Sequence, residues 1–123
     1  MPQVTQEAQP VGREFDLQLG APHFTDEDPL VCKVRWTVTA NHGLAVITEW
    51  ERDDRGRVVR LVVTDREAAM RLMLESIVET NLTGPDGQPI PVRLLERHVP
   101  PLGLAGLLEQ WVQDAWALTN QGN

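Results

Sequence analysis

Apolar and polar residues alternate in two segments of the first half of the chain, and this period of two predicts β-strands. The first strand is short and covers 15–19. The second covers 30–39, and the side chains on its apolar face are Leu30, Cys32, Val34, Trp36 and Val38. The segment between them holds two prolines and three consecutive acidic residues, which is typical of a loop.

The segment 44–52 fits two structures. Leu44, Ile47 and Trp50 have the spacing of a helical stripe, but alternate residues from Leu44 also form one face of a strand. A turn is predicted before it, at 40–43. The sequence DDRG that follows and the β-branched run 57–63 favour a β-hairpin over a helix.

Helical periodicity dominates the second half of the chain. Thr64 and Glu67 fit a capping box, in which the threonine hydroxyl accepts a hydrogen bond from the backbone N–H of Glu67. The helix that begins there is expected to run to about Thr80. Turn-forming residues fill 81–91. A short helix at 92–99 then ends at two prolines, and a last helix covers roughly 102–119.

These elements predict an α+β fold. A small antiparallel β-sheet or hairpin meander forms the N-terminal half, and three helices form the C-terminal half. The length of 123 residues is that of one domain, expected at 14–120. The polar and aperiodic residues 1–13 are expected to form a flexible N-terminal arm.

The last helix is more apolar than a surface helix needs to be. Helical spacing places several leucines and a tryptophan on one face, and further apolar residues widen that face. One explanation is that the helix closes the domain's own core. The other is that part of this surface binds another chain, because contiguous apolar patches mark interaction sites. The residues expected to bind a protein partner are Leu104, Leu108, Trp111, Val112 and Trp116.

Charge and composition narrow the range of partners. The chain has 18 acidic and 11 basic residues, a formal net charge of −7 and a pI near 4.8. A nucleic-acid-binding surface needs a basic face, so we expect no nucleic-acid partner, and an acidic protein is also unsuited to an anionic membrane. No apolar run is long enough to span a bilayer, and the N-terminus does not resemble a signal peptide, so the expected location is cytoplasmic.

No constellation of catalytic or metal-binding residues emerges from the sequence. The three histidines have no second ligand at helical spacing, and the single cysteine excludes a Cys-x-x-Cys site. The acidic trio 26–28 lacks the alternating pattern of a calcium loop. No phosphate-binding Gly-Lys-Ser/Thr occurs. We therefore expect no catalytic residues, no cofactor and no metal, and a protein that is not an enzyme.

The segment 68–120 carries a sequence of features in a fixed order. A helix rich in Ala, Met and Leu (AAMRLMLESIVETN) runs into a turn (GPDGQPIP), a short helix and proline follow (VRLLERHVP), and an amphipathic helix ends the segment (LAGLLEQWVQDAWALTN). This pattern resembles that of the tail assembly chaperones of long-tailed bacteriophages. The acidic pI and the small size are similar too.

The resemblance implies a binding function without catalysis. Tail assembly chaperones coat the apolar helices of a tape-measure protein and recruit tail-tube subunits, so the implied partners are a tape-measure or tail-tube protein, with self-association as a further expectation. The implied location is the cytoplasm of the host bacterium. An alternative function is that of a small structural subunit of a phage head or tail, which would be retained in the finished virion.

Overall fold

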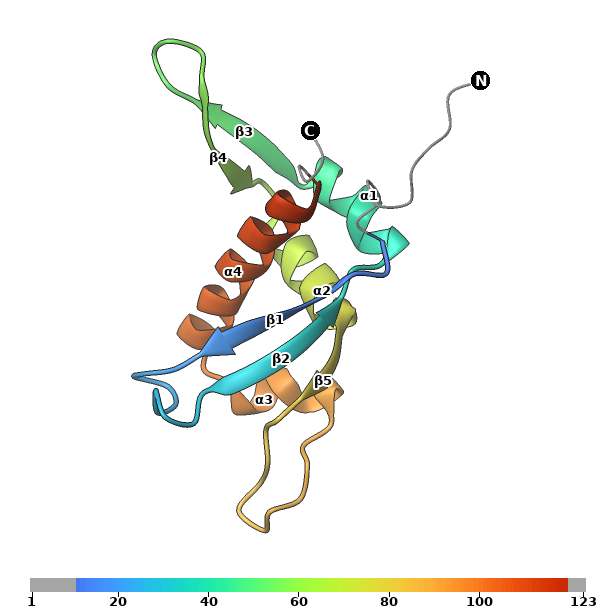
Figure 1. Ribbon diagram of the computed structural model, residues 1–123, viewed down its shortest axis with the longest axis vertical. Helices are drawn as coiled ribbons and strands as arrows, with labels where there is room; N and C mark the ends of the chain where they lie inside the picture. The colour runs from blue at the N-terminus through green and yellow to red at the C-terminus, as the bar shows by residue number, and fades with distance from the viewer. Residues whose placement is uncertain (1–10, 120–123) are drawn as a thin grey trace.

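The computed structural model describes residues 11–119, apart from the side chains of residues 116, 118 and 119. Three antiparallel strands form the larger of its two sheets (Figure 1). Strand β2 (Leu30–Arg35) lies in the centre of this sheet, between β1 (Glu14–Leu19) and β5 (Ile77–Thr80). The two strands predicted from alternation are therefore confirmed, and the structure pairs them with each other. Strand β5 was not predicted.

The alternation in β1 and β2 separates an inner face from an outer face. Leu17, Cys32 and Val34 are fully buried, whereas Asp16 and Lys33 are exposed. The polar outer face is stabilised only weakly by surface ion pairs, because exposed pairs contribute little to the free energy of folding. The inner face requires a cover, and the helices provide it.

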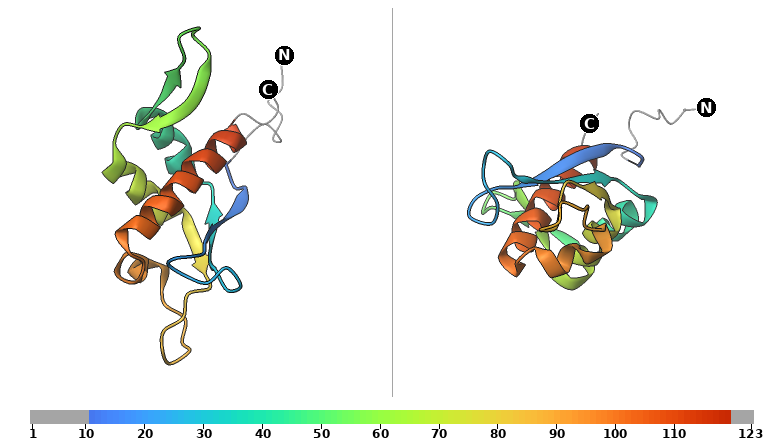
Figure 2. Two further views of the ribbon diagram at one scale, coloured as in Figure 1. Left: turned by 90° about the vertical axis from the view of Figure 1, so that its left-hand side faces the viewer. Right: turned by 90° about the horizontal axis from the view of Figure 1, so that it is seen from below.

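A β-hairpin forms the second sheet and extends away from the rest of the molecule (Figures 1 and 2). It consists of β3 (Thr48–Arg52) and β4 (Val58–Val63). The Asp53 carboxylate accepts hydrogen bonds from the backbone N–H groups of Arg55 and Arg57, and Gly56 takes the positive φ of 79° that the turn requires. The predicted hairpin is confirmed.

Helix α1 (Val38–Val46) replaces both the predicted turn at 40–43 and the end of the predicted second strand. The Thr37 side chain caps this helix by accepting a hydrogen bond of 3.0 Å from the backbone N–H of Ala40. The strand therefore ends at Arg35, and Val38 is exposed on α1 instead of lying on the buried strand face. The segment 44–52 is divided between helix and strand.

Helix α2 (Arg66–Ser76) begins and ends at other residues than predicted. Asp65 is its N-cap and accepts a hydrogen bond of 3.1 Å from the backbone N–H of Ala68, so the capping box at Thr64 was wrong. The backbone N–H of Thr64 donates instead to the carbonyl of Ile47, which continues the hairpin ladder. The helix stops four residues early because the segment after it pairs with β2 as strand β5.

Three further elements complete the described chain. The 3-10 turn η2 (Val92–Leu94) and the short helix α3 (Leu95–His98) occupy the predicted short-helix segment, and α4 (Pro101–Thr119) is the predicted last helix. Helices α2 and α4 lie against the inner face of the larger sheet (Figure 2). The order of antiparallel strands and helices confirms the α+β class, although α1 interrupts the strands and β5 interrupts the helices.

The core is centred on two tryptophans. The rings of Trp36 and Trp111 are fully buried, with centroids 5.2 Å apart and planes inclined at 45°. Trp36 also exchanges backbone hydrogen bonds with the N-terminal segment, because Gly12 N–H donates to its carbonyl and its own N–H donates to Arg13. The last two residues of the predicted arm thus extend the sheet edge, and residues 1–10 lie outside the described part.

Candidate protein-binding surfaces

The structure places most of the predicted partner-binding residues in the chain's own core. Each of four side chains is between 0% and 8% exposed; these are Leu104, Leu108, Trp111 and Val112. The prediction that they form an exposed apolar face is therefore wrong. The fifth, Trp116, has a side chain outside the described part of the structure.

The physical reason is that α4 packs against three elements at once. It contacts β1, α2 and β4, so a broad apolar face is needed to close the core without a partner. The sequence analysis compared this face with the single apolar stripe of a surface helix, and closure of the core was the alternative to partner binding. The position of the helix between the larger sheet and the hairpin accounts for them.

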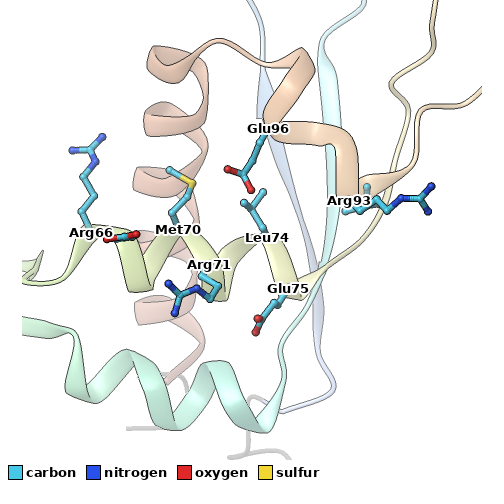
Figure 3. A pocket seen from close by; sticks show the side chains of 9 residues that line it. Arg66, Met70, Arg71, Leu74, Glu75, Arg93 and Glu96 are labelled. Carbon is cyan, nitrogen blue, oxygen red and sulfur yellow. The ribbon is translucent and has the colours of Figure 1, made fainter.

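A different apolar surface is open to solvent, in a groove between α2 and the η2–α3 segment (Figure 3). The groove has a volume of about 830 Å³. Its apolar lining consists of Met70 and Leu74 from α2 and Val92 from η2. All three side chains are half-buried and pack against the core, so the floor of the groove is held in place from below.

Local helix geometry explains this floor. Met70 and Leu74 are four residues apart, so they lie one above the other on the same face of α2. The fully buried Ala69 and Met73 lie on the neighbouring face. The opposite wall is added by Val92, which follows the long turn after β5. No local sequence pattern places Val92 beside Met70 and Leu74.

Six charged residues surround this apolar floor, three of each sign. They are Arg66, Glu67, Arg71, Glu75, Arg93 and Glu96. None of them forms an ion pair with another residue of the described chain, where the ion pairs lie on the larger sheet and the hairpin. Figure 3 shows the guanidinium groups of Arg66, Arg71 and Arg93 well separated from one another. The rim is thus neutral overall but carries charges with unused hydrogen-bonding capacity.

Two further grooves flank the hairpin. One, of about 610 Å³, lies between α1 and β3 and is lined in part by Leu44 and Trp50. The other, of about 550 Å³, lies between β4 and α4. Exposed apolar side chains also gather on the hairpin, where Trp50 is 47% and Val59 is 56% exposed. Exposed apolar groups on a projecting element are typical of contact surfaces.

Perturbed ionisation occurs away from the α2 groove. Burial raises the pKa of Cys32 to about 11, and burial also raises the pKa of Asp114. Hydrogen bonding, first of all from the backbone N–H of Arg57, lowers the pKa of Asp53 in the hairpin turn. None of these three residues lines the α2 groove.

Neither a metal-binding cluster nor a membrane-spanning helix occurs among the described residues. No group of three or more His, Cys, Asp or Glu side chains there has an arrangement that could hold a metal ion. No helix there has both the length and the hydropathy that crossing a bilayer requires.

The comparisons with known proteins give one partial similarity. The chain is 38% identical over 68 residues to L-lactate dehydrogenase A-like 6B of Homo sapiens. The alignment covers 55% of this chain and 18% of that protein, so the chain spans less than a fifth of its relative. No family model and no solved structure matches. The resemblance to tail assembly chaperones therefore remains a prediction.

Proposed function

We propose that this chain is a non-catalytic assembly protein that binds an amphipathic helix of a protein partner in the α2 groove. The observation that carries the proposal is the half-buried apolar floor of Met70, Leu74 and Val92 inside a ring of charges that have no partner in the described chain. A helix with an apolar stripe would cover the floor, and charged residues beside its stripe would pair with the rim.

The more specific form of the proposal is a phage tail assembly chaperone. In that role the bound helix belongs to a tape-measure protein, whose apolar helices need cover before the tail assembles. The order of helix, turn, short helix and last helix in 68–120 is the feature that supports it. The groove is built from two of these elements, the first helix and the short helix.

A dehydrogenase activity is less well supported. The share of L-lactate dehydrogenase A-like 6B that aligns is 18%. Dinucleotide sites of the Rossmann type use a glycine-rich turn between a parallel strand and a helix. Within residues 11–119, the two sheets are antiparallel, so no parallel strand leads into a helix. Strands β2 and β4 lead into their helices through Trp36-Thr37 and Thr64-Asp65 without a glycine, and the glycines of 81–91 follow β5, which is an antiparallel strand.

The proposal is tested with a synthetic peptide of about 20 residues that forms an amphipathic helix with leucines at i, i+3, i+4 and i+7 and with Glu and Lys on its flanks. Fluorescence anisotropy measures the binding of the labelled peptide. Leu74→Glu places a charge in the apolar floor and should weaken binding at least tenfold. Val78→Glu is the matched control, because Val78 is an exposed valine outside the groove, and it should bind as the natural chain does.

Two results would count against a helix-binding groove. One is the absence of peptide binding by the natural chain at millimolar concentration. The other is equal binding by the Leu74→Glu and Val78→Glu variants. Circular dichroism of both variants shows that each is folded before binding is compared.

The alternative of a virion subunit draws support from the hairpin, whose projecting apolar side chains Trp50 and Val59 would serve as contact elements. Mass spectrometry of purified particles separates the two functions. A chaperone leaves the assembly and should be absent from the particles, whereas a structural subunit should be retained in fixed stoichiometry.

A further inference from the structure

We propose that two copies of this chain associate through the outer edges of their β4 strands, to form a four-stranded antiparallel sheet in the order β3-β4-β4-β3. This interface is separate from the α2 groove and does not rest on the proposed function. Three features of the hairpin point to this interface: the free edge of β4, the net charge, and the side chains that a two-fold axis would bring together.

Strand β4 has an open edge in the described part of the chain. Its backbone pairs with β3, and between residues 11 and 119 no other strand pairs with it. The groove between β4 and α4 is lined by four consecutive residues of the strand, 60–63. Because successive side chains of a strand point to opposite faces, a groove that touches all four runs along the edge of the strand.

The far wall of this groove is built partly from small residues. It is formed by Leu102, Ala105 and Gly106 of α4, among others. Two of these residues are small, and Leu102 is 80% exposed. A strand placed beside β4 would cover Leu102 and pair with the open edge. Unpaired strand edges of this kind are recurrent sites of association.

The charge of the hairpin is compatible with a second copy of the chain as the occupant of this edge. The segment 48–63 contains four arginines and four acidic residues, so its net charge is zero, whereas the whole chain carries −7. Two hairpins can therefore approach each other without a net repulsion between the hairpins themselves. This net-neutral hairpin also projects from the molecule (Figure 1).

The β3 edge and the β4 edge of the hairpin differ in whether each can pair with the same edge of a second copy. Antiparallel pairing of two β3 strands about a two-fold axis at Glu49, Trp50 or Glu51 always sets a carboxylate opposite another carboxylate. Like charges directly opposite each other destabilise a sheet. The β3 edge is therefore protected against pairing with its own copy.

The β4 edge has no such protection in one register. A two-fold axis at Leu61 sets that residue opposite its copy, Val59 opposite Val63, and Arg60 opposite Val62. The other register that pairs five residues has its axis at Arg60 and sets two guanidinium groups against each other. The Leu61 register is thus the one we assign to the dimer.

Residue 62 provides a test in which the monomer and the dimer respond in opposite directions. Within one chain, Val62 lies directly opposite Glu49 of β3. Across the proposed interface it lies opposite Arg60 of the second copy. A glutamate at this position would be unfavourable within the hairpin and favourable in the dimer, and an arginine would have the reverse effects.

The experiment is sedimentation equilibrium of the natural chain, Val62→Glu and Val62→Arg from about 1 μM to 1 mM. We expect a reversible monomer–dimer equilibrium, tightened on the order of fivefold by Val62→Glu and weakened on the order of fivefold by Val62→Arg, since each change acts twice in a two-fold dimer. Urea unfolding of dilute monomer should rank the two variants in the opposite order. Val78→Glu and Val78→Arg are controls on an exposed position of β5 and should not differ in dimer affinity.

The proposal is overturned if the natural chain stays monomeric throughout this range. It is also overturned if Val62→Arg, the variant with the more stable monomer, forms the tighter dimer. That result would place residue 62 away from Arg60 of the second copy. A dimer whose affinity is equal in both variants likewise excludes the β4 edge.

Discussion

The indole nitrogen of Trp111 donates a hydrogen bond of 3.0 Å to the hydroxyl oxygen of Ser76. Both residues are buried, and the hydroxyl in turn donates 2.7 Å to the carbonyl oxygen of Met73. This chain of hydrogen bonds joins α4 to the last turn of α2 inside an otherwise apolar core. It satisfies the one polar atom of a tryptophan that the core encloses completely.

Ser76→Ala should destabilise the protein, because it leaves the buried Trp111 N–H without its acceptor. The expected loss is about 1–3 kcal/mol in the free energy of unfolding, measured by urea titration. Trp111→Phe removes the donor, so adding Ser76→Ala to it should cost less than Ser76→Ala alone. Additive losses in this double-mutant cycle would mean that the hydrogen bond contributes little.

Asp65→Ala should destabilise helix α2 through the loss of its N-cap. The Asp65 carboxylate accepts from the backbone N–H of Ala68, and replacing such a cap by alanine costs about 1 kcal/mol. Asp65→Asn keeps an acceptor and serves as the control, with a smaller loss. Thr64→Ala should cause little loss of stability, because Thr64 does not cap the helix. A loss from Thr64→Ala as large as that from Asp65→Ala would show instead that Thr64 is the N-cap.

The sequence predicted those elements that local patterns determine. Alternation located β1 and β2, turn residues and β-branched residues located the hairpin, and the prolines marked the start of α4. Strand β5 could not be found in this way. Its residues continue the apolar spacing of α2, and the segment becomes a strand only because the distant β2 offers it a paired edge.

The candidate site was harder to predict than the fold. Leu104, Leu108, Trp111 and Val112 were assigned to a partner because the apolar face of the last helix is broader than the stripe that a surface helix needs. The structure gives α4 three neighbours. The α2 groove, by contrast, combines α2 with a segment some twenty residues later, and no local pattern brings the two together.

The hairpin turn should become less stable at acid pH, because Asp53 then becomes protonated. Hydrogen bonds, chiefly from the backbone N–H of Arg57, lower its pKa below the ordinary 3.8. A carboxyl group with a lowered pKa stabilises the folded form above its ordinary pKa, and this contribution is lost as the pH falls through the folded value. The amide NMR shifts of Arg55 and Arg57 should therefore titrate with a midpoint below 3.8. A midpoint at or above 3.8 would show that the turn does not favour the carboxylate, and Asp53→Asn should abolish the titration.

Cys32 should reduce stability at alkaline pH. Burial raises the pKa of its thiol from 9.0 to about 11. The thiol therefore loses its proton at a lower pH in the unfolded chain than in the folded chain. As a result, the free energy of unfolding is unaffected by this group below pH 9 and falls as the pH rises toward 11, by an amount on the order of 2 kcal/mol. The chain has no tyrosine to obscure this effect. Urea midpoints measured from pH 8 to pH 11 should show a decline that Cys32→Ala lessens; equal declines in both chains would contradict it.

The most direct test of the proposed helix-binding groove uses methyl NMR of methionine. Met70 lines the groove, whereas Met73 lies one turn further along α2 and is fully buried in the core, so the two methyl groups are a probe and an internal control on one helix. With ¹³C-labelled methionine methyls and the amphipathic peptide added stepwise, we expect the Met70 signal to shift to saturation while the Met73 signal stays in place. A Met70 signal that does not move at millimolar peptide would contradict binding in the groove.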